Sequence, residues 1–152
     1  MAAVQSAGIL LHRAGASEVL LVHPGGPFWA RKDAGAWSIP KGEVEEGEDP
    51  GAAARRDFAE ETGTTLPDGA LEPLGSVKLK SGKVVHGFAV AGDLDPEAIV
   101  SSTFELEWPP RSGRITTFPE VDRAGWFGLD EAREKLNPAQ AAFVDRLAAS
   151  AG

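Results

Sequence analysis

The sequence predicts an α/β protein in which a mixed β-sheet is packed between helices. The expected elements follow the order of three strands, a helix, further strands and two closing helices. Short apolar or alternating runs bounded by Gly, Pro and Asp indicate the strands, whereas caps and apolar stripes indicate the helices. A length of 152 residues, without an internal repeat or linker, is that of one ordinary domain. We therefore expect a single domain over residues 1–152.

The first half of the chain is expected to contain three strands. Residues 4–11 are mostly apolar, and residues 19–22 form a second short apolar run that makes a hairpin with the first. Alternating apolar residues at 37–40 predict a third short strand that ends at Pro40.

A helix over residues 50–62 follows. Asp49 is a favoured N-cap and Pro50 suits the first helical position. Gly63 stands where a left-handed residue would end the helix.

The second half is expected to hold a hairpin, a final strand and two helices. Residues 74–79 and 84–91 flank a turn at 80–83. Lys78, Lys80 and Lys83 would form a basic rim for terminal phosphates or, as we prefer, protect an edge strand. The final strand covers 124–129. We expect Asp130 to N-cap a helix through Leu136, and a last helix to run from Ala139 to about Ala148.

Composition excludes several functions. The chain has no cysteine, so disulfides, zinc–thiolate sites and thiol catalysis are ruled out. A net charge of -8 argues against loose binding to bulk nucleic acid or to anionic membranes, and an anionic substrate would need metal cations. No run approaches membrane-spanning length and no signal-like start is present, so we expect a cytoplasmic protein.

Three acids are grouped on the helix. Asp57, Glu60 and Glu61 lie at i, i+3 and i+4, so they share one face near its C-terminal end. Like charges repel at this spacing, and the C-terminal end of the helix dipole disfavours anions. A bound divalent cation would offset both unfavourable effects. A solvated acidic face is the alternative, and these residues alone do not decide between the two.

The wider spacing resembles the Nudix box of the Nudix hydrolase family. That pattern has a Gly, five residues, Glu, seven residues, Arg-Glu, a hydrophobic residue, any residue, Glu-Glu, any residue, Gly and a hydrophobic residue. Seven of its nine positions agree, namely Gly42, Glu48, Arg56, Phe58, Glu60, Glu61 and Gly63. Asp57 replaces the family's Glu and Thr64 its last hydrophobic residue.

The resemblance implies an α/β/α sandwich with a mixed sheet, and water attack on a phosphoric anhydride that needs Mg2+ or Mn2+. It implies that Glu60, Glu61 and the Gly42 carbonyl bind the metal. Asp57 would bind metal or position water, although its shorter side chain would then reach through a bridging water. Arg56 and Glu48 would be the pair that orients the helix face.

A second acid is expected in a later loop, as general base or further metal ligand. We choose Glu120, because an acid shortly before the last strand recurs in hydrolases of this kind. Glu105 and Glu107 are the other candidates, and Glu120 is otherwise a surface residue after Pro119.

Substrate contacts are predicted from cationic and aromatic residues. Lys41 would bind phosphate, because the Pro-Lys-Gly entry resembles dinucleoside polyphosphate hydrolases. Arg111 and Arg114 would bind polyphosphate or are ordinary surface residues. Phe28 and Trp29 would stack on a nucleotide, or cover the edge of the core, which is the reading we favour here.

Together these observations predict a metal-dependent pyrophosphohydrolase of nucleoside or dinucleoside polyphosphates, with diadenosine tetraphosphate as the first choice. Oxidised nucleoside triphosphates, ADP-ribose and RNA 5′ ends are the alternatives. Relatives that act on dinucleotides often carry a downstream Tyr, and this chain has none. A catalytically weak nucleotide sensor is the alternative of another class. The partner would be a small nucleotide, and the protein a monomer or homodimer.

Overall fold

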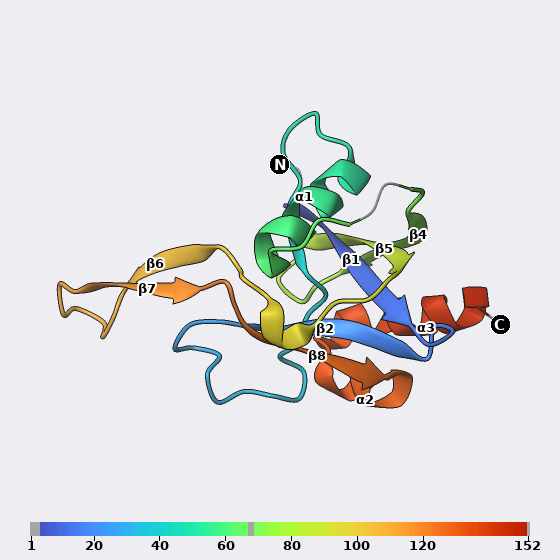
Figure 1. The fold of residues 1–152 in the computed structure, drawn as a ribbon. Coiled ribbons are helices and arrows are strands. Elements are labelled where there is room, and N and C mark those ends of the chain that lie inside the picture. Colours follow the sequence, from blue (N-terminus) through green and yellow to red (C-terminus); the bar gives the residue numbers. More distant parts are fainter. Residues whose placement is uncertain (1–3, 67–68, 152) are drawn as a thin grey trace.

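The computed structural model describes residues 4–66 and 69–151, which form a mixed sheet with helices on both faces (Figure 1). The strands are β1 (Gln5–Arg13), β2 (Glu18–Pro24), β3 (Lys41–Glu43), β4 (Glu72–Lys78), β5 (Val84–Ala91), β6 (Thr103–Glu107), β7 (Ile115–Pro119) and β8 (Val121–Gly128). The helices are α1 (Pro50–Thr62), α2 (Leu129–Lys135) and α3 (Ala141–Ala151), with 3-10 turns η1 (Pro96–Ala98) and η2 (Pro138–Gln140).

The main sheet has the order β4-β5-β1-β2-β8. β1 and β5 are parallel, whereas the other neighbours are antiparallel, so the predicted mixed sheet is confirmed. β3 pairs with the start of β1, in the register Ala7↔Gly42 and Gly8↔Lys41. This pairing holds the entry to α1 against the centre of the sheet.

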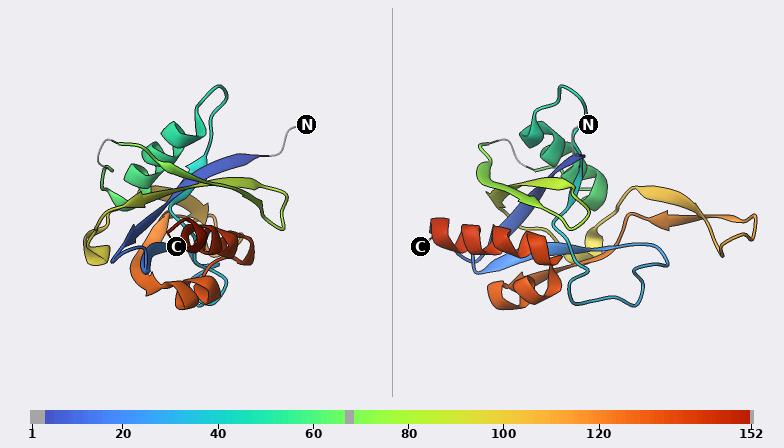
Figure 2. Two further views of the ribbon diagram at one scale, coloured as in Figure 1. Left: turned by 90° about the vertical axis from the view of Figure 1, so that its right-hand side faces the viewer. Right: turned by 180° about the vertical axis from the view of Figure 1, so that it is seen from behind.

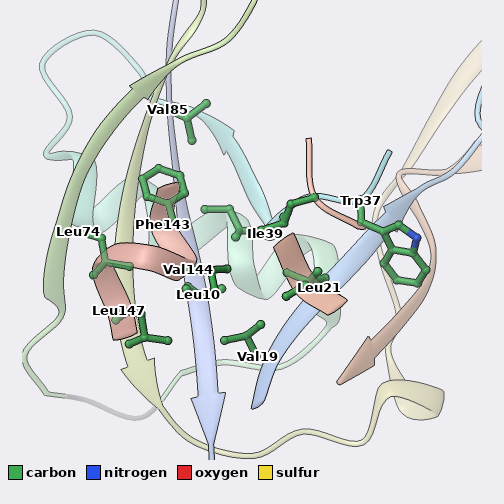
Figure 3. Close-up of a cluster of buried hydrophobic side chains, with 13 residues drawn as sticks. Leu10, Val19, Leu21, Trp37, Ile39, Leu74, Val85, Phe143, Val144 and Leu147 are labelled. Carbon is green, nitrogen blue, oxygen red and sulfur yellow. The ribbon is translucent and has the colours of Figure 1, made fainter. Parts of the chain in front are cut away.

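Alternation along β1 divides the core between the two faces of the sheet. Ala7, Ile9 and Leu11 pack against α1 in one buried cluster. Leu10 lies in the other cluster, which contains Phe143 and Leu147 of α3 (Figure 3). The predicted α/β/α sandwich is therefore confirmed, and its two helical layers are seen edge-on in Figure 2.

Helix α1 has the bounds that its capping signals predict. The Asp49 side chain accepts a hydrogen bond from the Ala52 N–H (3.1 Å), and Gly63 adopts a left-handed φ of 75°. A Cβ at Gly63 would also lie 2.8 Å from the carbonyl oxygen of Val100. Gly63 therefore both ends the helix and lets the next segment approach it.

Two expected features are wrong, and one strand was missed. Residues 37–40 form no strand: Trp37 and Ser38 make isolated bridges only, and pairing with β1 begins at Lys41, beyond Pro40, which has no N–H to donate. Asp130 does not cap α2, because Gly128 holds the N-cap position and Asp130 lies in the first turn, bonded to Arg133 (2.7 Å). β7 was not expected.

β6 and β7 form a separate two-stranded sheet, which we call the arm. The arm stands away from the main sheet, and the loop of residues 25–36 projects on the same side of the molecule (Figure 1 and the right-hand view of Figure 2). Over the described residues, no helix combines the length and apolar character needed to cross a membrane.

Candidate active site

Asp57 is buried at the junction of α1 and β3. A Cβ built on Gly42 would lie 2.3 Å from the Asp57 carboxyl carbon and within 2.6 Å of both its oxygens. Because no side chain fits between them, the glycine brings the backbone of β3 directly against this carboxyl group. Gly42 is thus a packing requirement of the acidic helix face.

Arg56 ties the helix to the loop that precedes it. Its guanidinium forms an ion pair with Glu48 and donates to the Glu43 carbonyl (2.8 Å). It also lies 3.4 Å from Oδ2 of Asp57. The predicted pairing of Arg56 with Glu48 is present, and it fixes the face of α1 that carries Asp57.

Glu61 and Glu60 complete that face. Oε1 of Glu61 accepts a hydrogen bond from the Lys41 N–H (3.3 Å), whereas the Glu60 side chain is exposed. Backbone hydrogen bonds run from the Ser102 N–H to the Glu60 carbonyl and from the Glu120 N–H to the Ser102 carbonyl, each 2.8 Å long. The structure therefore brings the loop of Glu120 to the end of α1.

Two of these carboxyl groups have raised pKa values although each has a cationic neighbour. Burial raises the pKa of Asp57 to about 6, where Arg56 opposes the shift and the charge of Glu60 adds to it. Burial also raises the pKa of Glu61 to about 8, where Lys41 opposes the shift and the charges of Glu120 and Asp57 add to it. Glu120 is thus close enough to Glu61 to influence its ionisation.

The donor atoms suit a hard divalent cation, because carboxylates and a backbone carbonyl are the ligands that Mg2+ and Mn2+ prefer. Asp57, Glu60, Glu61 and the Gly42 carbonyl could supply them. Within residues 4–66 and 69–151, no three acidic or imidazole side chains already converge on one point. The carboxyl groups of Asp57 and Glu60 are nevertheless neighbours, since a hydrogen bond with Glu60 contributes to the raised pKa of Asp57.

Lys41 leaves β3 on the other face from the one that meets Asp57, because successive strand residues point to opposite sides. Its Cβ lies 2.7 Å from a Cβ built on Gly8. Burial and the nearby charge of Lys83 lower the pKa of Lys41, against the charges of Glu61 and Asp57. Lys83, assigned from the sequence to edge protection, is thus near enough to Lys41 to form a basic pair with it.

The other predicted residues lie on the arm. Arg111 and Arg114 are exposed in the turn at its tip, far from α1 in Figure 1, so the structure does not bring them to the carboxylates. Glu105 and Glu107 lie on the exposed face of β6. Phe28 and Trp29 do not cover the core edge as expected, since they are 61% and 39% exposed.

Sequence reasoning missed the residues that join these parts through their backbone. The Gly25 N–H donates to the Glu120 carbonyl (2.9 Å), and a Cβ on Gly25 would lie 1.9 Å from the Pro119 carbonyl oxygen. Ser102 bridges Glu60 and Glu120 in the same way. Such contacts depend on the position of the main chain, so no pattern of side chains in the sequence predicts them.

The raised pKa values predict that the metal-free protein loses stability as pH rises. A buried acid whose folded-state pKa exceeds its ordinary value of 4.5 stabilises the fold below that value. This contribution disappears as pH rises through about 8, the folded-state pKa of Glu61. We expect the melting temperature to fall by roughly 5–10 °C between pH 5 and 9.

Thermal melts with and without Mn2+ measure this effect. Bound cation should reduce the fall in melting temperature between pH 5 and 9. The Glu61→Gln substitution should reduce the same fall in the absence of metal. If wild type and the variant had parallel pH profiles, Glu61 would not be a buried acid with a raised pKa.

Comparison with known proteins identifies a family for the chain. Residues 3–147 match the NUDIX domain family. The chain is 50% identical over 52 residues to an RNA pyrophosphohydrolase of Caulobacter vibrioides (strain NA1000 / CB15N), a match that covers 31% of the chain and 30% of the relative's length.

Two solved structures share the fold. A C. elegans Ap4A hydrolase in a binary complex superposes with a TM-score of 0.67 at 20% identity, over 95% of this chain and 96% of the other. The NUDIX domain of Shewanella oneidensis NrtR complexed with ADP ribose superposes with a TM-score of 0.63 at 17% identity, over 99% of this chain and 88% of the other. With the family match over nearly the whole sequence, the chain belongs to the NUDIX domain family.

Proposed function

We propose that the protein is a metal-dependent pyrophosphohydrolase that cleaves a phosphoric anhydride in nucleoside or dinucleoside polyphosphates. The observation that carries this proposal is the acidic face of α1, whose buried carboxyl groups are only partly compensated by Arg56 and Lys41. Asp57 and Glu61 are held with raised pKa values beside the Gly42 backbone, and Glu120 lies near Glu61. An acidic face of this kind is stabilised by the cation that anhydride hydrolysis requires.

We assign each residue of the candidate site a role in metal binding, positioning or proton transfer. Glu60, Glu61 and the Gly42 carbonyl would bind Mg2+ or Mn2+, which when bound neutralises phosphate oxygens and lowers the pKa of water. Asp57 would bind the same cation or position water, and Arg56 with Glu48 would hold the helix face in place. Glu120 would accept the proton of the attacking water or add a ligand, because its backbone is fixed to Ser102 and Gly25 while its side chain is exposed.

The substrate would carry more than one negatively charged phosphate group. Lys41 has no ion-pair partner among the described residues, and its pKa is lowered by burial and by Lys83. Phosphate oxygens would pair with both lysines and relieve their mutual repulsion. A dinucleoside polyphosphate such as diadenosine tetraphosphate remains our first choice, and oxidised triphosphates, ADP-ribose and triphosphorylated RNA are the alternatives.

Product analysis on a substrate panel tests this proposal. Wild-type protein with Mg2+ is expected to release a mononucleotide or phosphate from at least one of these substrates, and EDTA should stop the reaction. Glu131→Gln, which removes an exposed acid of α2, serves as a variant with unchanged turnover. No turnover of any substrate, with nucleotide binding retained, would instead favour the sensor function.

A further inference from the structure

Exposed aromatic side chains gather where the arm meets the loop of residues 25–36. Phe28 packs edge-to-face on Trp108, with ring centres 5.4 Å apart. Phe28 is 61% and Trp29 39% exposed, and neither belongs to the two buried clusters. Phe28, Trp29 and Trp108, which we call the aromatic cluster, therefore present ring surface to solvent.

The arm has two different faces. Phe104, Leu106 and Trp108 alternate with Glu105 and Glu107 along the strand. The apolar side receives the loop, since a Cβ on Gly26 would lie 2.9 Å from the Phe104 ring. The acids consequently lie on the side away from the aromatic cluster.

Basic side chains accompany the cluster. Lys32 Nζ lies 4.9 Å from the centre of the Trp29 ring, and Arg31 is also exposed in the loop. Arg111 and Arg114 follow Trp108 in the turn of the arm. The one acid among residues 25–36 is Asp33, which is paired with Lys135 (2.5 Å). In a chain of net charge -8, this region is locally basic.

Both segments start at the candidate active site. The carbonyl of Glu60 is linked by backbone hydrogen bonds to Ser102, Ser102 to Glu120, and Glu120 to Gly25. The arm leaves this chain of bonds at Ser102, and the loop leaves it at Gly25. At about 3.3 Å per residue, Trp108 lies up to ~20 Å along the arm from Ser102.

We propose that the aromatic cluster binds a nucleobase of the substrate, with the four basic side chains contacting the phosphates or ribose beside it. Aromatic rings stack on any base, and neighbouring cations add affinity for an anionic ligand. This inference rests on the proposed function and narrows its substrate class. The bound base is separated from the cleaved anhydride by several phosphates, as in a dinucleoside polyphosphate.

The test compares ligands that differ only in their base. Affinities of wild type for a methylene-bridged, non-hydrolysable diadenosine tetraphosphate and for inorganic tripolyphosphate are measured by calorimetry with Mg2+. We expect Phe28→Ala and Trp29→Ala each to weaken binding of the dinucleotide about 10-fold. Binding of tripolyphosphate should not change, because it lacks a base.

Matched variants separate stacking from folding of the arm. Trp108→Phe keeps an aromatic ring and should retain most of the affinity, whereas Trp108→Ala should lose it. Ile115, which is 63% exposed and pairs with Glu107, lies on the opposite face of the arm. Ile115→Ala removes a similar apolar surface there and should leave both affinities unchanged.

Two results would overturn the inference. Equal loss of affinity for the dinucleotide and for tripolyphosphate would show that the cluster does not recognise a base. Unchanged affinities, with a change of oligomeric state in sedimentation, would show that it contacts a second copy of the chain. Since the calorimetry needs no turnover, an inactive protein with base-dependent binding would contradict the proposed function alone.

Discussion

Replacing Glu61 with Gln is expected to reduce kcat on the order of 10³-fold while leaving the fold intact. Glu61 is mostly buried and accepts a hydrogen bond from the Lys41 N–H. Burial raises the pKa of this carboxyl group to about 8. Gln has nearly the same shape and can still accept that hydrogen bond, but it brings no negative charge to a cation. Initial rates with Mg2+ and the substrate found in the panel measure the loss.

Circular dichroism and thermal melting of the same variant provide the control for folding. A native spectrum with an unchanged or higher melting temperature would assign the lost activity to the missing charge. A Glu61→Gln protein that hydrolysed substrate as fast as wild type would contradict the assignment of Glu61 as a metal ligand.

Replacing Gly42 with Ala is expected to lower both stability and activity. The added methyl group would occupy the space of the Asp57 carboxyl group, whose carbon lies 2.3 Å from it. Either β3 shifts away from α1 or Asp57 rotates out of its buried position. Overpacking of this kind costs about 1–3 kcal/mol, which for a chain of 152 residues corresponds to a melting temperature lower by ~2–12 °C.

A second substitution distinguishes this clash from a general effect of adding a methyl group. Gly42→Ala combined with Asp57→Ala should recover most of the stability, because the smaller side chain makes room. Gly128→Ala should cost little, since nothing lies within 4 Å of a Cβ at that position. If Gly42→Ala melted like wild type, the close packing of β3 on Asp57 would be disproved.

Local signals explain why α1 was predicted to the residue. Asp49, Pro50 and Gly63 act on the backbone within one turn of their own positions, so their effect does not depend on the rest of the fold. The shared face of Asp57, Glu60 and Glu61 follows from helical geometry alone. The ion pair of Arg56 with Glu48 was implied by the family pattern and is also local.

Features that depend on tertiary packing were not predictable in the same way. Asp57 is buried because Gly42 of another element lies against it. Lys41 lies near enough to Lys83 to be affected by its charge because β3 pairs with β1 in one register. The two-stranded arm was not predicted, because turn residues on both sides of β7 obscured that strand. No local sequence signal indicates that Arg111 and Arg114 lie away from the carboxylates of α1.

The binding of Mn2+ to wild type and to Glu61→Gln tests the central claim most directly. Loss of the free Mn2+ electron paramagnetic resonance signal on adding protein reports the bound ion without any need to know the substrate. The acidic face of α1 predicts saturable binding by wild type that is at least about 10-fold weaker in the variant. Equal binding by both proteins would contradict the claim that this face of the helix is the metal site.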